Sequence, residues 1–248
     1  SDLRAALNDG GVSRILLVAG TYEFADDMCS DQGGSALCID RNVTIEAEVA
    51  GSVVLDAKGA RRVIYVSTTA GRTELVGLNI TGGDADYGGG ILINIRGSAS
   101  LTDCNFYDSV ASIDGGGLFI AGTATLINTN VYENQADRSG GGLIIAGTAT
   151  LTNTNVYENQ AGAGGGLNVH GTATLINSNI YSNTATLGGG LYIYTSGTAT
   201  LINTNVYSNR AGNGGGLSIS GTATLTDTNV YDNKGGGLAV YGTATLTD

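Results

Sequence analysis

The chain of 248 residues carries a formal net charge of −11 at pH 7, which argues against nucleic acid and anionic membrane surfaces as partners. Charged residues make up 13% and aromatic residues 6% of the chain, so a narrow, elongated core is expected instead of one large globular core. The longest apolar run, residues 15–19, is too short to cross a bilayer, and no membrane insertion is expected.

The first part of the chain predicts a cap and irregular coils, over residues 1–81. Leu3, Ala6 and Leu7 recur at helical spacing before Gly10 and Gly11, which predicts a short N-terminal cap helix over residues 2–8. Runs rich in β-branched residues between turn residues then predict short strands at 15–18, 20–22, 43–46, 53–55, 63–66 and 74–80.

Three cysteines bear on the environment of the protein. Cys29 and Cys38 flank a loop of Ser, Asp, Gln and Gly, which favours a small disulfide over two free thiols. Such a bridge suits a secreted or cell-surface location. Cys104 has no nearby histidine and is interpreted as a structural thiol.

From residue 82 onward a repeat recurs, with the consensus Gly-Gly-Gly-Leu-x-Ile-x-Gly, Thr-Ala-Thr-Leu-Thr, Asn-Thr, Asn-Val-Tyr-x-Asn and a variable loop. The motif Gly-Thr-Ala-Thr-Leu occurs six times, and its first threonines lie 25, 24, 26, 24 and 21 residues apart. This period fits one coil of three short strands and three turns, about 24–25 residues long. The sequence therefore predicts an all-β parallel solenoid, as a single domain over 1–248 with a regular array over 82–248.

The alternation of side chains assigns each repeat position to the core or the surface. Leu143, Ile145, Ala149, Leu151 and Val156 are expected inward, and Ile144 outward. Three further columns are interpreted as scaffold, because turn-closing asparagines and stacked rings hold coils together. They comprise Asn128, Asn153, Asn177, Asn203 and Asp227; Asn134, Asn159, Asn183, Asn209 and Asn233; and Tyr107, Tyr132, Tyr157, Tyr181, Tyr207 and Tyr231.

These motifs resemble the pectate-lyase-like right-handed parallel β-helix superfamily. The Gly-Gly-Gly-Leu and Asn-Val-Tyr-x-Asn elements are similar to the repeats of chlamydial polymorphic outer-membrane proteins. The resemblance covers nearly the whole chain and implies a right-handed β-helix. It does not imply one function, since the superfamily includes lyases, hydrolases, epimerases, adhesins and ice binders.

An enzyme of this superfamily would carry ionisable groups on the outer face of the first strand of each coil. The outward positions expected there are not ionisable: they are Phe119, Ile144, Asn168, Tyr192, Ser218 and Ala239. Loop residues Asp84, Asp86 and Asp114, with Arg96 one strand away, could bind Ca²⁺ loosely, but solvated loop charges are the favoured interpretation. In polygalacturonases, paired aspartates and an Arg-Ile-Lys motif accompany the histidine. The chain has His170 but neither of these motifs. The sequence predicts neither a catalytic site nor a cofactor.

Paired outward threonines are the main candidate site. Strand propensity alone would accept other β-branched or aromatic residues there, yet every regular coil keeps both. They are Thr123, Thr125, Thr148, Thr150, Thr172, Thr174, Thr198, Thr200, Thr222, Thr224, Thr243 and Thr245, with Ser98 and Ser100 as a weaker forerunner. The third outward column is Ile127, Thr152, Ile176, Ile202, Thr226 and Thr247.

Parallel strands would place these hydroxyls on a flat grid, about 4.8 Å by about 6.7 Å. The grid is similar to the stacked Thr-x-Thr surface of insect antifreeze solenoids, which implies ice or another ordered surface as the partner.

An adhesive or structural module remains an alternative, with a glycan bound through variable columns such as Tyr192, Tyr194 and Arg210. A carbohydrate-active enzyme is the third candidate function. The array runs to Thr247 and Asp248 without a cap pattern, so either a cap lies outside this sequence or the open end pairs with another chain, as end-to-end self-association.

Overall fold

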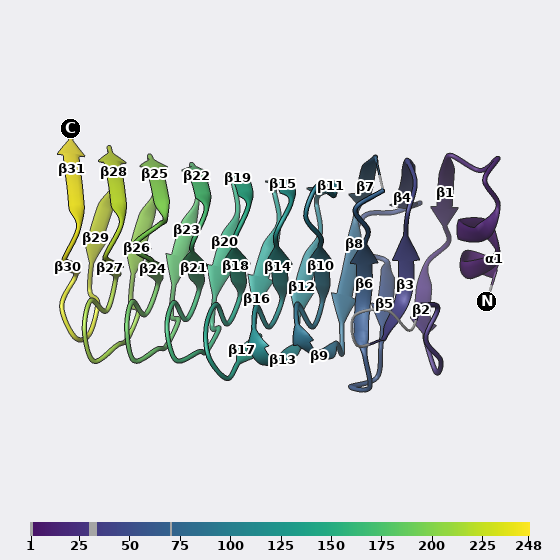
Figure 1. The fold of residues 1–248 in the computed structure, drawn as a ribbon, viewed down its shortest axis with the longest axis horizontal. Coiled ribbons are helices and arrows are strands. Elements are labelled where there is room, and N and C mark those ends of the chain that lie inside the picture. Colours follow the sequence, from purple (N-terminus) through teal and green to yellow (C-terminus); the bar gives the residue numbers. More distant parts are fainter. Residues whose placement is uncertain (1, 30–33, 70) are drawn as a thin grey trace.

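The protein is a right-handed parallel β-helix in a computed structural model that describes residues 2–29, 34–69 and 71–248. Figure 1 shows the coils stacked along one long axis, with the helix α1 (Asp2–Asn8) at the N-terminal end. This confirms the predicted fold class, the three strands per coil and the cap helix.

Three long parallel sheets run the length of the solenoid, one for each strand of the coil. We name them the ladder sheet, the cleft sheet and the tyrosine sheet. The ladder sheet comprises β1 (Arg14–Leu17), β4 (Val43–Ala47), β7 (Arg72–Val76), β11 (Ser98–Thr102), β15 (Thr123–Ile127), β19 (Thr148–Thr152), β22 (Thr172–Ile176), β25 (Thr198–Ile202), β28 (Thr222–Thr226) and β31 (Thr243–Thr247).

The cleft sheet comprises β3 (Ser35–Ile39), β6 (Arg62–Val66), β10 (Ile91–Ile93), β14 (Leu118–Ile120), β18 (Leu143–Ile145), β21 (Leu167–Val169), β24 (Leu191–Ile193), β27 (Leu217–Ile219) and β30 (Leu238–Val240). The tyrosine sheet comprises β2 (Gly20–Glu23), β5 (Val53–Asp56), β8 (Leu78–Thr81), β12 (Asn105–Tyr107), β16 (Asn130–Tyr132), β20 (Asn155–Tyr157), β23 (Asn179–Tyr181), β26 (Asn205–Tyr207) and β29 (Asn229–Tyr231). A short fourth sheet forms in the loops, from β9 (Asp84–Tyr87), β13 (Val110–Asp114) and β17 (Gln135–Ala136).

The core is the narrow column that the repeat predicts. In the coil at 143–159, Leu143, Ile145, Ala149, Leu151 and Val156 are all buried and pack into one continuous cluster. Stacking places each of them against the same position of the next coil, so a small core per coil becomes a long one.

Alternation along the cleft sheet predicts the direction of a side chain but not its exposure. Ile144 lies on the outward side of its strand, outside the core cluster, yet it is only 2% exposed. The loop that precedes the cleft sheet folds over this face, where Gly140 adopts a φ of +62° and a Cβ would lie 2.8 Å from Ile144 Cγ1. The glycine triplet therefore serves a loop that covers the sheet, which strand alternation could not reveal.

Asparagine columns hold the coils together, as interpreted from the sequence. Asn134 Nδ2 donates to Asn159 Oδ1 over 3.1 Å, and Asn159 Nδ2 donates to Asn183 Oδ1 over 3.0 Å. The same carboxamide oxygens accept backbone N–H groups of the preceding coil, over 3.0 Å for both Asn134 and Asn159. These buried amides are fully used within the protein.

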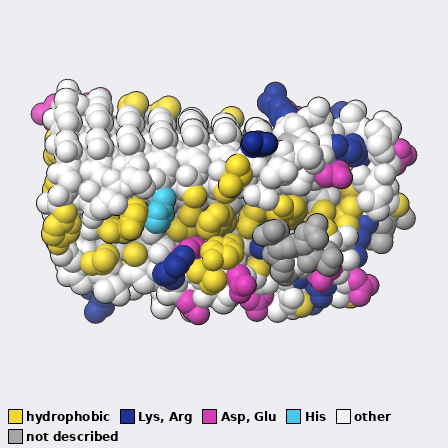
Figure 2. Space-filling model, in the orientation of Figure 1, with side chains coloured by type: hydrophobic (Ala, Val, Ile, Leu, Met, Phe, Trp, Pro, Cys, Tyr) yellow, Lys and Arg dark blue, Asp and Glu magenta, His cyan; other side chains and the backbone are white. Residues whose placement is uncertain are grey.

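The two ends of the solenoid differ in surface character. Figure 2 shows most of the visible charged side chains over the N-terminal coils at the right, where the ion pairs Arg14–Glu46 and Arg72–Glu74 lie on the ladder sheet. In the part of the chain that the structure describes, no helix is long and apolar enough to cross a membrane.

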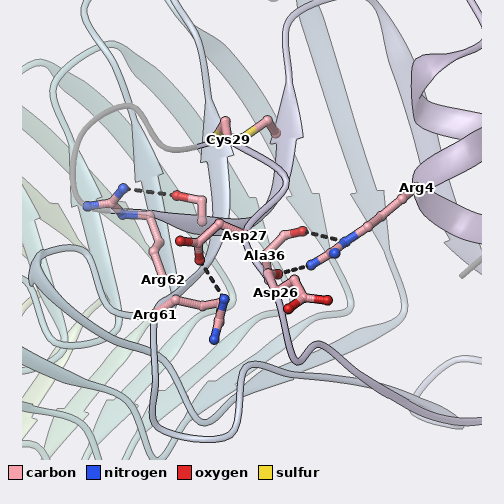
Figure 3. Close-up of polar contacts among 9 residues, drawn as sticks. Arg4, Asp26, Asp27, Cys29, Ala36, Arg61 and Arg62 are labelled. Carbon is pink, nitrogen blue, oxygen red and sulfur yellow. Dashed lines mark hydrogen bonds and ion pairs between the residues drawn. A yellow bond between two sulfur atoms is a disulfide. The ribbon is translucent and has the colours of Figure 1, made fainter.

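Arginine contacts and a disulfide between Cys29 and Cys38 stabilise the chain on either side of residues 30–33, close to the cap helix (Figure 3). Arg4 Nε donates to the carbonyl oxygen of Ala36 over 3.0 Å, and Arg61 Nη1 pairs with Asp27 Oδ1 over 2.6 Å. The disulfide that the sequence favoured is therefore present.

Candidate functional site

The threonine face consists of the twelve paired threonines on the outer side of the ladder sheet. Each threonine pairs in register with the threonine at the same position in the next coil, from β15 to β31. The first threonine of each pair is exposed, and the second is half-buried in every coil but the last. The structure thus places all of them outward in two straight columns.

Among the described residues, no hydroxyl of the threonine face has a hydrogen-bond partner within the protein. The threonines that do bond are elsewhere: Thr129 Oγ1 donates to the backbone inside the coil, and Thr226 and Thr247 bond each other over 2.9 Å in the third column. Unlike the asparagine amides, the hydroxyls of the threonine face are directed to the surroundings.

Charged strands border the threonine face on its N-terminal side. Arg72 and Glu74 of β7 form an ion pair of 2.9 Å and lie in register with Ser98 and Ser100 of β11. From β11 onward the outward positions carry Ser, Thr and Ile only, and Figure 2 shows these strands as rows of uncharged side chains along the upper edge. The uncharged grid therefore has a defined border.

A second candidate site lies on the cleft sheet. A cleft of about 250 Å³ opens between the loops that cover the cleft sheet, such as the one at Gly140, and the turns that follow its strands. It is lined by Asp114, Arg138, Ser139, Asn168, His170, Tyr192 and Tyr194. The histidine, cyan in Figure 2, lies within a band of hydrophobic side chains. These residues come from successive coils, so residues one repeat apart meet in the cleft.

One wall of the cleft carries an ion pair. Arg138 Nε donates to Asp114 Oδ1 over 3.0 Å, and Arg138 Nη2 donates to Asp114 Oδ2, while the Asp114 side chain is only 9% exposed. The hydrogen bond to Asp114 raises the pKa of Arg138. The sequence had grouped Asp114 with Arg96, whereas the structure gives it Arg138 as its partner. No group of three or more metal-ligating side chains forms within the described ranges.

Aromatic rings form the opposite wall. The His170 imidazole stacks on Tyr194, with ring centroids 4.5 Å apart, and Tyr192 meets Tyr194 edge-on at 6.3 Å. Burial is the main cause that lowers the pKa of His170, with Arg138 lowering it further and Asp114 opposing. The imidazole is therefore neutral at pH 7, and it presents a flat, uncharged ring to the cleft.

The floor of the cleft includes a buried polar atom without a partner. Asn168 is 1% exposed, and its Oδ1 accepts no hydrogen bond from any described residue. Its strand position pairs with Ile144 on one side and Tyr192 on the other, neither of which offers a donor to that oxygen. Buried acceptors are almost always satisfied, so this oxygen is exceptional; it has almost no exposed surface, and a ligand reaches it only if the Asn168 side chain turns into the cleft.

Sequence reasoning identified Asn168, Tyr192 and His170 singly but did not bring them together. Arg138 was missed altogether, because its role depends on Asp114 in the preceding coil. The available signal was the repeat length: Arg138 follows Asp114, and Tyr194 follows His170, by one coil each. Arg210, which was considered with the two tyrosines, lies in the stack of loop residues with Thr184 and Lys234.

Solved structures with a similar fold include the pectate lyase Pel9A, with a TM-score of 0.56 and 13% identity over 98% of this chain and 72% of that one. An alginate lyase from Paenibacillus sp. str. FPU-7 gives a TM-score of 0.54 and 14% identity over 99% of this chain and 94% of that one. At these identities the likeness shows the fold alone.

No protein with a curated description matches the sequence. Residues 89–247, more than half of the chain, match the family described as the right handed beta helix region. The chain therefore belongs to the right-handed β-helix family.

Proposed function

We propose that the chain binds a glycan in the cleft, without cleaving it. The observation that carries this proposal is the pairing of the aromatic wall of His170 and Tyr194 with the unpartnered Oδ1 of Asn168. The CH-rich face of a sugar ring packs on flat aromatic rings, while its hydroxyls donate to carbonyl oxygens. One sugar residue satisfies both features if the carboxamide of Asn168, whose Oδ1 is buried, turns toward it.

Charge favours an uncharged glycan over a polyuronate. Arg138 is the cation of the cleft, and it is already neutralised by Asp114. The chain as a whole carries −11 charges, which repel a polyanion. The pectate lyase and alginate lyase of similar fold support a polysaccharide as the class of ligand, and the charges of this chain select within that class. The Cys29–Cys38 disulfide supports a secreted or cell-surface location, where glycans are met.

Isothermal titration with neutral polysaccharides, such as glucomannan and β-glucan, tests this proposal against polygalacturonate and alginate. Tyr194→Ala is expected to weaken neutral glycan binding about tenfold, because it removes a ring from the stacking wall. Tyr207→Ala on the tyrosine sheet is the matched control and should leave binding unchanged. Binding of the polyuronates alone, or release of unsaturated sugar ends from them, would overturn the proposal.

Asn168→Val provides a sharper test of the same site. Removal of a buried, unpartnered acceptor should leave the free energy of unfolding equal or higher, because an unsatisfied group is lost. Glycan affinity should fall at the same time. A valine variant that binds as well as the parent chain would show that Asn168 does not recognise the ligand.

Ice adsorption at the threonine face is a second candidate function, favoured by the register of its two threonine columns over six strands. A flat β-sheet that holds hydroxyls and methyl groups at fixed spacing needs no ordering when it binds, so little free energy is lost on adsorption. Adsorbed molecules would inhibit ice growth through local surface curvature, without covalent chemistry.

Thermal hysteresis and ice-crystal shaping test this second function. Thr174→Lys places a charge in the middle of the array and should abolish most of the hysteresis while the fold is retained. Gln160→Lys is the matched control, because the stacked loop positions that follow it along the solenoid already include Arg210 and Lys234. Absence of hysteresis in the parent chain at high concentration would eliminate ice binding, and equal loss in both lysine variants would assign the effect to charge alone.

A further inference from the structure

The outer side of the tyrosine sheet carries an unbroken column of stacked rings. The tyrosine ladder has ring centroids 4.8–5.2 Å apart and interplanar angles of 4–8°, and it consists of Tyr107, Tyr132, Tyr157, Tyr181, Tyr207 and Tyr231. Most ring faces are covered by the neighbouring rings. The ring edges and hydroxyls remain at the surface, so the ladder presents a flat aromatic strip parallel to the axis of the solenoid.

The two sides of this strip differ chemically. An asparagine column lies on one side, and its side-chain amides form hydrogen bonds with one another. For example, Asn155 Nδ2 donates to Asn130 Oδ1 over 2.9 Å. On the other side, each of the first three tyrosines is followed by an exposed carboxylate, at Asp108, Glu133 and Glu158. Within the described chain, none of these carboxylates forms an ion pair.

The carboxylates and the rings act on one another electrostatically. Burial raises the pKa of Tyr157 to about 12, and Glu158 and Glu133 add to the shift, together with the neighbouring tyrosines. The pKa of Tyr132 is raised by burial and by Tyr107, Glu133 and Asp108. The strip is therefore neutral along its rings and negative along one border at physiological pH.

We propose that the tyrosine ladder is a binding strip for elongated, planar aromatic cations. The flat face of such a molecule covers the exposed ring edges and hydroxyl oxygens of several tyrosines and so buries apolar surface of both partners. Its positive charge lies over Asp108, Glu133 and Glu158, whose column supplies the complementary sign. Because the rings repeat at every coil, the long axis of the ligand follows the axis of the β-helix.

Titration of the full chain with thioflavin T, an elongated planar aromatic cation, tests this proposal. We expect a saturable rise in dye fluorescence with an induced circular dichroism signal, because the dye is held rigidly in a chiral site. An uncharged benzothiazole analogue should bind more weakly by about threefold, since it gains nothing from the carboxylates.

Variants locate the dye on the strip. Tyr157→Ser interrupts the ladder at its centre and should weaken dye binding by about threefold to tenfold, the range of one aromatic pair. Tyr157→Phe keeps the ring and should retain binding, which separates loss of the strip from loss of the fold. Tyr194→Ser removes an exposed tyrosine from the cleft and is the matched control.

The charged border is tested with Glu133→Gln and Glu158→Gln together. These exposed changes should weaken thioflavin T binding by about threefold and leave the neutral analogue unaffected. The proposal is overturned by the absence of saturable binding, by equal binding of an anionic dye, or by binding that neither Tyr157→Ser nor the two glutamine changes affect. None of these outcomes depends on glycan or ice binding.

Discussion

Removal of one buried asparagine is expected to weaken the solenoid far more than removal of a half-buried one in the same coil. Asn159 is 1% exposed, and its Nδ2 donates to the carbonyl oxygens of Val131 and Tyr157 over 2.9 and 2.8 Å. It also donates to Asn183 Oδ1 over 3.0 Å, and its own Oδ1 accepts the backbone N–H of Asn134 over 3.0 Å. One side chain thus links three successive coils.

Asn159→Ala leaves the N–H of Asn134 buried without an acceptor. An orphaned buried donor costs about 1–3 kcal/mol, and loss of the remaining bonds adds about 1 kcal/mol for each fully lost pair, so we expect a decrease of about 3–5 kcal/mol in the free energy of unfolding. This is a large fraction of the total stability of a typical domain, about 5–15 kcal/mol.

Asn155→Ala is the matched comparison. Asn155 is half-buried and exchanges single amide bonds of 2.9 Å with Asn130 and with Asn179, which water can replace. Its removal should cost about 1 kcal/mol or less.

Urea denaturation followed by circular dichroism measures the difference between the two variants. Because repeat proteins can open coil by coil, hydrogen exchange at the Asn134 amide gives the local value independently. Equal losses in the two variants, or a loss below about 1 kcal/mol for Asn159→Ala, would refute the reasoning that the buried column holds the coils together.

Two further predictions concern the cleft and its covering loop. Burial lowers the pKa of His170 in the folded chain. As the pH falls below about 6.5, the imidazole is therefore protonated more in the unfolded chain than in the folded chain, and the free energy of unfolding should decrease. Urea titrations at successive pH values should show this decrease in the parent chain and a smaller one in His170→Gln; identical profiles would contradict it. Gly140→Ala should lower the free energy of unfolding by at least about 2 kcal/mol, since the Cβ would lie 2.4 Å from the carbonyl oxygen of Leu143 at a φ of +62°. Thermal melts check this against Gly10→Ala, where a Cβ meets nothing within 4 Å and little change is expected.

The three outward columns show how the repeat separates scaffold from surface. Asparagine amides are consumed by bonds between coils, and tyrosine ring faces are covered by the next ring. The hydroxyls of the threonine face and the edges of the tyrosine ladder are left for other molecules. Repetition thus builds two different linear surfaces on one fold, while the cleft at His170 depends on residues that do not repeat.

The amino-acid sequence by itself determined the period, the three strands of each coil, the cap helix and the columns of Leu, Asn, Tyr and Thr. It could do so because a parallel solenoid places each residue beside its equivalent one repeat away, so a one-dimensional pattern becomes a contact map. The outward direction of Thr123 and Thr125 follows from alternation along one strand, which is a local property.

Only the tertiary structure decided what covers the cleft sheet and which residues meet there. Ile144 lies on the outward side of its strand yet is buried, because the loop at Gly140 folds back over the sheet through backbone contacts with the neighbouring coil. The same fold-back joins Asp114 to Arg138 and leaves Asn168 Oδ1 at the floor of the cleft without a partner. The path of a variable loop is set by such long-range contacts, and alternation along a strand carries no information about them.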